Sequence, residues 1–305
     1  MKRLLLFAAL FSINSSLHAQ VNLTAHVSGR SYELARDQLP RRADAHPLAS
    51  ALAWQALQRG LELTEFTVEA GKLGADVRII ALRVEPQLFD FSLVHETRAN
   101  RMTGAWTVDA APDDAAFAFN AGQFKETGPW GWLVLNGEER RPPGVGPLSV
   151  GIAFDTAGAV RWVPYGELAK ARADRAVRFA FQSYPTLLFG EVVPMLPAKS
   201  ELLDRTHRDA RLIMAQDRAG RMLLVLTRYD GLGAVTGRVP IGLTVPESIV
   251  LIAAMGARHA VMLDGGVSAQ LLVRDASGRA RTWKGVRAVP LALIGRARID
   301  TDKTH

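Results

Sequence analysis

The sequence predicts an α+β protein with a mixed, largely antiparallel sheet as its core and flanking helices. Three observations support this fold class. Apolar and polar residues alternate with a period of two in many short segments. Turn residues join consecutive segments, as at Asn136-Gly137, which is a strong hairpin signal. Helical spacing is confined to a few stretches, so hairpins outnumber βαβ units.

Residues 1–19 have the layout of a secretory signal peptide. A basic start at Lys2-Arg3 precedes an apolar run over residues 4–13, and a polar stretch then ends at Ala19. The apolar run is too short to cross about 30 Å of hydrocarbon as a helix. We therefore expect a periplasmic or secreted protein that keeps no membrane anchor after cleavage.

Residues 20–60 have weak periodicity and predict an irregular N-terminal arm with a short helix over residues 48–57. From Leu61 the period changes to two, and no repeat or low-complexity linker interrupts the chain as far as residue 298. Residues 61–298 are therefore expected to form one domain.

The elements of this domain follow from the same two periods. Strands are expected over residues 61–68, 77–84, 88–94, 117–119, 132–135, 150–154, 160–163, 210–215, 222–227, 261–263, 271–273 and 289–294. Helices are expected over residues 166–178 and 246–255. Pro246 suits the first turn of the second helix and Gly256 suits its end.

Composition excludes several classes of function. The chain has 305 residues, with 37 Lys and Arg against 30 Asp and Glu, and both signs are scattered along it. This pattern indicates a mildly basic surface and no nucleic-acid partner. The absence of cysteine excludes disulfides, thiolate metal sites and cysteine nucleophiles. Tryptophan is more often a core residue than a ligand platform, although Trp130 or Trp132 could stack on a sugar.

Two turns that follow apolar strands carry polar groups. Asn120 ends the first strand, and Gly122 leaves the backbone of the next turn accessible. Asp264 ends the second strand, Gly265-Gly266 allow a ligand to approach backbone N–H groups, and Ser268 adds a hydroxyl. Each motif alone is also explained as an ordinary strand-terminating turn.

A third stretch is His207-Arg208-Asp209-Ala210-Arg211, just before an expected strand. Arginine offers a planar fork that matches phosphate or carboxylate oxygens. Taken alone, this stretch is also explained as a solvated run of charges.

The order of these motifs resembles the phosphodiester glycosidase family over about residues 61–273. The resemblance rests on Asn120-Ala121-Gly122-Gln123-Phe124, Gln182-Ser183-Tyr184-Pro185, Arg211 ahead of Gln216-Asp217, and Leu263-Asp264-Gly265-Gly266-Val267-Ser268. The sequence departs from the family where Gln123 replaces Phe or Met and where Val267 replaces a third glycine.

The resemblance implies a glycosidase that hydrolyses sugar-1-phosphodiester linkages, and together with the predicted signal peptide it indicates an exported enzyme that acts on surface or extracellular glycans. Asp264 would be the main catalytic carboxylate, with Glu247 or Asp230 as the second. Arg211 would hold the phosphate. The other expected substrate contacts are Asn120, Gly122, Gln182, Gly265, Gly266 and Ser268.

Two other functions remain compatible with the sequence. One is a non-catalytic glycan-binding protein on the same fold, and the other is a phosphodiesterase that cleaves the P–O bond. The spacing of residues requires no cofactor, although Asp264 with neighbouring carbonyl oxygens could bind a hard divalent cation.

Overall fold

The computed structural model describes residues 21–36, 38–71, 74–98, 101–125, 128–196, 203–228 and 242–298. Every strand pairing in these residues is antiparallel. The α-helices of this part are short: α1 (Pro47–Ala51), α2 (Leu168–Ala171) and α3 (Val245–Ala254). The predicted antiparallel strands are therefore confirmed, but the fold is more sheet-dominated than an α+β label suggests. The predicted signal peptide lies outside the described residues.

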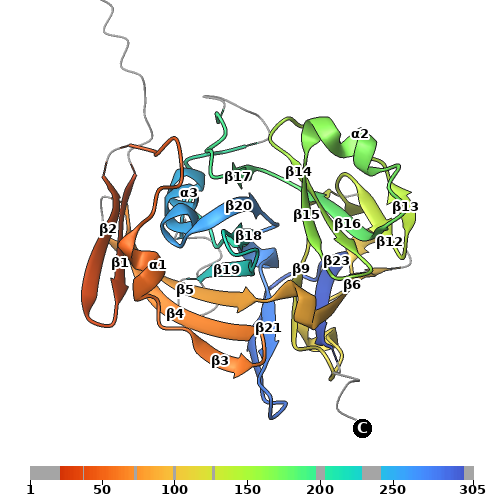
Figure 1. The fold of residues 1–305 in the computed structure, drawn as a ribbon, viewed down its shortest axis with the longest axis horizontal. Coiled ribbons are helices and arrows are strands. Elements are labelled where there is room, and N and C mark those ends of the chain that lie inside the picture. Colours follow the sequence, from red (N-terminus) through yellow and green to blue (C-terminus); the bar gives the residue numbers. More distant parts are fainter. Residues whose placement is uncertain are drawn as a thin grey trace, which may run out of the picture.

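The largest sheet has nine strands and curves around α3 (Figure 1). Its order is β17-β20-β18-β19-β5-β4-β1-β2, and β3 pairs with β4. The strands are β1 (Asn22–Val27), β2 (Arg30–Arg36), β3 (Gln55–Gln58), β4 (Leu61–Ala70), β5 (Ala75–Val84), β17 (Thr186–Leu188), β18 (Leu212–Asp217), β19 (Met222–Arg228) and β20 (Ala257–Met262). Helix α3 contacts strands from both ends of this order, and all its residues are buried.

The predicted irregular arm is wrong for its first part. Strands β1 and β2 form a hairpin, and β1 also pairs with β4, so this segment extends the main sheet. In β1 the buried apolar residues Leu23, Ala25 and Val27 alternate with outward polar ones, which is the period-two pattern of a strand. The predicted helix over residues 48–57 ends at Ala51, because residues 55–58 pair with β4 instead.

Two five-stranded sheets complete the fold. One has the order β22-β21-β9-β23-β6 and the other has β13-β12-β16-β14-β15. Their strands are β6 (Phe89–His95), β9 (Phe117–Asn120), β21 (Leu271–Arg274), β22 (Ala280–Trp283), β23 (Leu291–Ala297), β12 (Leu133–Leu135), β13 (Glu138–Arg141), β14 (Val150–Asp155), β15 (Val160–Pro164) and β16 (Val177–Ser183). Two small ribbons are β7 (Thr97–Arg98) with β8 (Arg101–Gly104), and β10 (Phe124–Lys125) with β11 (Gly128–Pro129).

The predicted helix over residues 166–178 is mostly wrong. A 3₁₀ turn (Tyr165–Glu167) leads into α2, which ends at Ala171, and β16 begins at Val177. The Asp174 carboxylate accepts the N–H of Ala176 and so stabilises a turn where a helix would have to continue. Strand β16 then pairs on both sides, with β12 and β14.

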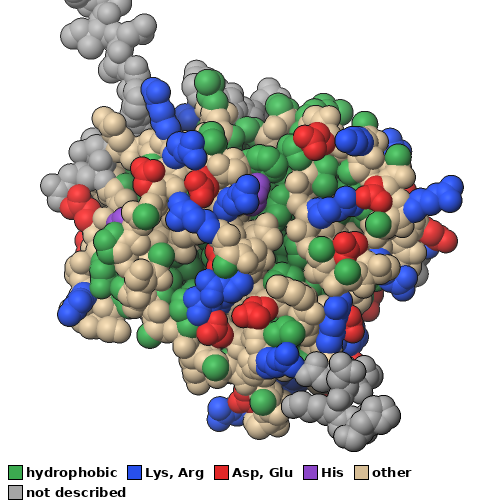
Figure 2. Space-filling view, viewed as in Figure 1, with side chains coloured by type: hydrophobic (Ala, Val, Ile, Leu, Met, Phe, Trp, Pro, Cys, Tyr) green, Lys and Arg blue, Asp and Glu red, His purple; other side chains and the backbone are tan. Residues whose placement is uncertain are grey.

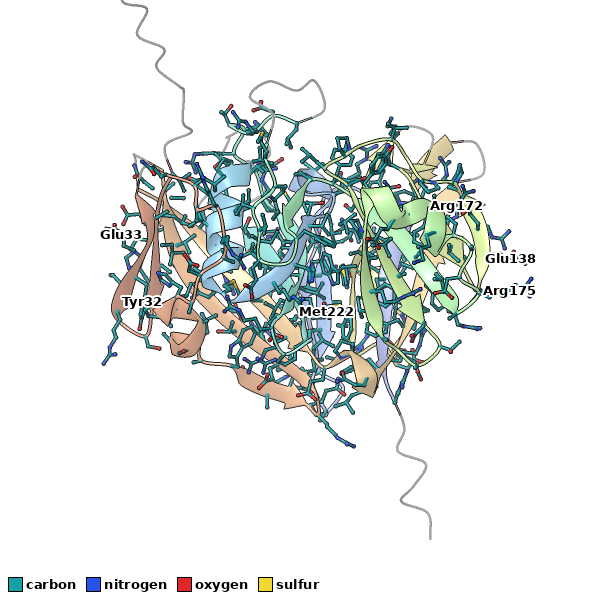
Figure 3. The ribbon with its side chains drawn as sticks, turned by 45° about the horizontal axis from the view of Figure 1, so that its top comes forward. Tyr32, Glu33, Glu138, Arg172, Arg175 and Met222 are labelled. Carbon is teal, nitrogen blue, oxygen red and sulfur yellow. The ribbon has the colours of Figure 1, made fainter. Side chains whose placement is uncertain are left out.

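One hydrophobic core surrounds α3, and a second lies where the main sheet packs on the two smaller sheets. Phe117, Phe154 and Phe181 lie in the second core, as does Met222, which Figure 3 labels in the interior of the molecule. Charged side chains of both signs are interspersed on the face in Figure 2. Within the described part of the chain, no helix has the length and apolar character needed to cross a bilayer.

Candidate active site

The ends of the three sheets meet around Asp264. Asn120 is the last residue of β9, Tyr184 lies in the link from β16 to β17, and Asp264 follows β20. The Asp264 N–H donates to the carbonyl of Gly122 over 2.9 Å, and the Gln123 side chain donates to the carbonyl of Tyr184, also over 2.9 Å. Motifs far apart in the sequence are therefore joined by direct hydrogen bonds.

The two glycines after Asp264 allow close packing on the segment before β18. The Gly266 N–H donates to the Ala210 carbonyl over 2.7 Å. A Cβ on Gly265 would lie 2.5 Å from that oxygen, and one on Gly266, where φ is +56°, would lie 2.6 Å from a carboxylate oxygen of Asp209. Because the Gly266 N–H is already bonded, these glycines support the turn rather than the expected anion nest.

The Asp264 carboxyl is partly exposed, and its environment favours the protonated form. Burial raises the pKa of Asp264, and the nearby Asp209 charge raises it further. A hydrogen bond from the buried Ser268 hydroxyl and the positive charge of Arg287 oppose this rise. A carboxyl with a perturbed pKa that solvent can reach is a candidate for acid–base chemistry.

Asn120 fixes the backbone of the Asp264 turn through two hydrogen bonds of its side chain. Its buried side chain donates to the Asp264 carbonyl over 2.8 Å and accepts from the Gln270 N–H over 3.0 Å. Gly122, where φ is +71°, accepts the Asp264 N–H. These contacts favour a positioning role for both residues over the predicted contact with substrate.

Gln182 is fully buried and its amide is saturated. The amide oxygen accepts from the N–H groups of Trp132 and Gly144, and the nitrogen donates to the Gly144 carbonyl and to the Ser149 hydroxyl. No capacity remains for a substrate hydrogen bond. We therefore assign Gln182 a structural role in place of the predicted substrate contact.

Glu247, the predicted second carboxylate, anchors the start of α3. It is 1% exposed and forms a capping box with Thr244. Both its oxygens also accept from Arg208, over 2.8 and 2.6 Å. This fully bonded carboxylate is a structural group. The other predicted candidate, Asp230, lies outside the described residues.

Arg211 is also committed to the fold. Its Nε donates to the Leu243 carbonyl over 2.7 Å and its Nη2 to the His207 carbonyl over 2.5 Å. Burial lowers the pKa of Arg211, and the charge of Asp209 opposes this effect. These bonds fasten the start of β18 to the entry of α3, which weakens its expected role in holding phosphate.

Two residues that sequence reasoning missed lie near Asp264. Arg287 is exposed in the loop before β23, and within the described part of the chain no hydrogen bond or ion pair occupies its guanidinium. Asp209 lies against Gly266, and its other carboxylate oxygen accepts the Ala210 N–H. Asp209 lies in the stretch 207–211, for which only the arginines were predicted to have a role. Arg287 is an isolated arginine in a loop, and no local pattern in the sequence marks it as a site residue.

A family model of phosphodiester glycosidases matches residues 113–294, which is more than half of the chain. This chain belongs to the phosphodiester glycosidase family. The matched span contains the Asp264 turn and most strands of the two smaller sheets. A search of curated proteins finds no match.

Two solved structures resemble this phosphodiester glycosidase family member in fold. One is the catalytic domain of zebrafish N-acetylglucosamine-1-phosphodiester alpha-N-acetylglucosaminidase, auto-inhibited by its pro-peptide. It has 16% identity and a TM-score of 0.60, and the match covers 86% of this chain and 94% of that one. The other is a hypothetical protein from Synechocystis, with 16% identity, a TM-score of 0.55, and coverage of 92% of this chain and 68% of that one. At this identity the likeness shows the fold alone.

The divalent cation considered for this family member stays a prediction. Among the described residues, no three His, Asp or Glu side chains gather in an arrangement that could hold a metal ion. Asp264 and Asp209 provide two carboxylates at the site, and further oxygen ligands would have to come from backbone or substrate.

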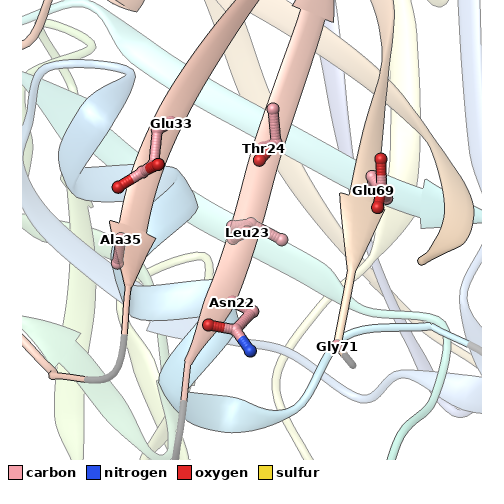
Figure 4. Close-up of a pocket in the computed structure, with 7 residues that line it drawn as sticks. All are labelled: Asn22, Leu23, Thr24, Glu33, Ala35, Glu69 and Gly71. Atoms are coloured by element: carbon pink, nitrogen blue, oxygen red, sulfur yellow. The ribbon is translucent and has the colours of Figure 1, made fainter. Parts of the chain in front are cut away.

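A separate hollow of about 380 Å³ lies on strands β1, β2 and β4 (Figure 4). It is lined by Asn22, Leu23, Thr24, Glu33, Ala35, Glu69 and Gly71. None of these residues belongs to the Asp264 turn or to its supports. The hollow is therefore distinct from the candidate active site.

Proposed function

We propose that this protein is an exported glycosidase that hydrolyses sugar-1-phosphodiester linkages in surface or extracellular glycans. The observation that carries the proposal is a partly exposed carboxyl, Asp264, whose pKa is raised by burial, a rise that the charge of an exposed arginine, Arg287, opposes. Family membership supports the reaction class, and the name of the zebrafish relative describes a sugar phosphodiester as its substrate.

The proposed reaction breaks the bond between the anomeric carbon and a phosphate oxygen. Water attacks the anomeric carbon, its proton passes to the Asp264 carboxylate, and the bonding electron pair leaves with the phosphomonoester. The environment that raises the pKa of Asp264 makes its ionised form a stronger base for this proton. Phosphate is a good leaving group, so the departing oxygen needs little assistance.

Arg287 is the group best suited to the phosphate. A guanidinium donates two parallel hydrogen bonds to phosphate oxygens, and that of Arg287 is not committed elsewhere in the described structure. Arg208, by contrast, donates to Glu247 and to the Gly242 carbonyl, and Nε and Nη2 of Arg211 donate to backbone carbonyls. Arg287 would thus hold the departing phosphate while the Asp264 carboxylate accepts the proton of the attacking water.

The test uses the chain without residues 1–19 and a panel of sugar-1-phosphodiesters in ¹⁸O-labelled water. Release of reducing sugar that carries the label would establish cleavage of the C–O bond. Label in the phosphate would contradict the proposal and identify a phosphodiesterase. Binding without turnover would also contradict it and favour the glycan-binding function.

The export part of the proposal rests on the basic, apolar and polar order of residues 1–19. Expression of the full chain with a signal-peptidase inhibitor control, followed by mass spectrometry of each cell fraction, tests it. We expect a product that begins near Gln20, outside the cytoplasm. An intact N-terminus in the cytoplasmic fraction would refute export and leave the proposed reaction unaffected.

A further inference from the structure

An aromatic pair lies beside Asp264 and has no part in the chemistry described so far. The rings of Trp130 and Tyr184 meet edge to face, with centroids 4.7 Å apart, and both side chains are half-buried. Burial raises the pKa of Tyr184, and so does the charge of Asp264, which places the phenol within electrostatic reach of the carboxyl. The pair therefore presents apolar ring surface next to the candidate catalytic group.

The indole of Trp130 is held from behind by a glycine loop. A Cβ on Gly144 would lie 2.7 Å from Cε2 and Cζ2 of the indole, and one on Gly146 would lie 3.7 Å from Cη2. The loop can lie against the ring at Gly144 only because that position lacks a side chain, whereas a Cβ on Gly146 would make an ordinary contact. The backbone N–H of Trp130 also donates to the Gln123 carbonyl over 2.7 Å, which fixes the main chain that carries the indole.

Gln182 fastens this loop to the rest of the sheet. Its amide bonds both the N–H and the carbonyl of Gly144, over 2.8 and 3.0 Å, and also the N–H of Trp132, over 2.9 Å. A Cβ on Gly131 would lie 2.5 Å from the amide oxygen. One buried amide thus connects the residues on both sides of the indole, and a pre-organised ring surface costs little ordering entropy on binding.

We propose that Trp130 and Tyr184 form the platform on which the pyranose ring of the substrate packs. The apolar C–H face of a sugar matches an aromatic face, and the phenolic and indole polar groups can serve its hydroxyls. The ring lies on the aromatic pair with its anomeric carbon at Asp264 and its phosphate toward Arg287. This inference rests on the proposed function and adds the subsite that binds the sugar.

The test measures sugar binding separately from hydrolysis. The probes are the methyl pyranosides of glucose, galactose, mannose and N-acetylglucosamine, titrated into the wild-type chain and followed by NMR. Trp130→Ala should weaken binding about tenfold and raise KM for the matching sugar-1-phosphodiester by a similar factor. Trp54→Ala is the matched control, because Trp54 is also half-buried but lies under Arg83, away from the Asp264 turn.

A second readout does not depend on the folding of the alanine variant. The indole N–H resonance of Trp130, assigned with Trp130→Phe, should shift when the bound pyranoside is added to wild type, and that of Trp54 should not. Lack of a shift, or binding of no pyranoside in the panel, would overturn the platform.

The outcomes separate this inference from the proposed function. Binding that depends on Trp130 without hydrolysis of any phosphodiester would support the platform and refute the glycosidase. Hydrolysis with an unchanged KM in a folded Trp130→Ala variant would refute the platform and leave the glycosidase intact.

Discussion

The start of α3 and the Asp264 turn both bring a carboxylate close to an arginine, yet the two regions differ in every contact. Glu247 is almost fully buried and accepts from Arg208 twice and from the Thr244 N–H over 2.9 Å. Asp264 is partly exposed and accepts a hydrogen bond from Ser268, and burial raises its pKa while the charge of Arg287, which is itself exposed, opposes this rise. The first carboxylate is satisfied by the fold, and the second is left open to solvent and ligand.

This difference shows how a structural carboxylate is distinguished from a chemical one. A group whose acceptors are all filled contributes free energy to folding and has nothing to offer a substrate. A carboxylate whose pKa is raised by burial, and whose oxygens lack a full set of hydrogen-bond donors, can accept a proton from a substrate or water. Its ionised form lowers the stability of the fold. The two groups should therefore respond in opposite ways to removal of their charge.

The largest expected effect is that of Asp264→Asn. Turnover of a sugar-1-phosphodiester should fall by about 10³-fold, because no base remains to accept the proton from water. Stability should increase at pH 7. A raised pKa in the folded state means that stability falls as pH rises through that pKa, and the neutral amide avoids this loss. Steady-state kinetics and thermal unfolding at pH 7 and pH 3 measure both effects.

Near wild-type turnover would remove Asp264 from the chemistry. We expect the unfolding temperature of the variant to exceed that of wild type by more at pH 7 than at pH 3. A larger difference at pH 3 would contradict the direction of the pKa shift of Asp264.

Glu247→Gln should show the opposite pattern. Loss of the buried pair with Arg208 should lower the free energy of unfolding by about 3 kcal/mol, while turnover per folded molecule stays close to wild type. Urea denaturation measures the first quantity, and steady-state kinetics normalised to the folded fraction measure the second. The control is Glu138→Gln on the exposed edge strand β13 (Figure 3), which pairs with Arg140 and should change stability by less than about 0.5 kcal/mol. A stable but inactive Glu247→Gln variant would make Glu247 catalytic after all.

Arg287→Ala extends the comparison from the carboxylates to the arginines near them. KM for a phosphodiester should rise about 10- to 100-fold, the equivalent of one charge-assisted interaction of about 1.5–3 kcal/mol. KM for an uncharged glycoside of the same sugar should not change, and neither should stability. Arg211→Ala is the matched comparison and should act mainly on stability, because it removes bonds to the Leu243 and His207 carbonyls. Equal effects of Arg287→Ala on both substrates would argue against phosphate binding.

His259 extends the comparison to a group away from the site and should give the smallest effect. It packs between Trp162 and Phe189, and burial together with the charge of Arg258 lowers the pKa of His259 to about 4. Between about pH 6.5 and pH 4 the unfolded chain therefore takes up the proton first, so stability falls as pH falls.

The variant His259→Gln should flatten this part of the stability profile, measured by urea denaturation at several pH values. A wild-type profile that is already flat would refute the shift.

Local signals in the sequence determined much of the fold. The hairpin at Asn136-Gly137 forms as predicted, with φ of +53° and +82° at the two residues. Pro246 and Gly256 bracket α3, and the period-two segments form strands near their predicted limits. These features are predicted correctly because each depends on the conformational preferences of a few neighbouring residues.

Only the tertiary structure decided how the side chains of the site are used. The sequence suggested Gln182, Glu247 and Arg211 as site residues, and the folded chain uses the hydrogen-bonding groups of all three internally. In the folded chain the expected arm forms strands β1 and β2, and Arg287 lies within electrostatic reach of Asp264. The physical reason is the same in each case. Whether a polar group is free depends on partners tens or hundreds of residues away, and no local propensity records them.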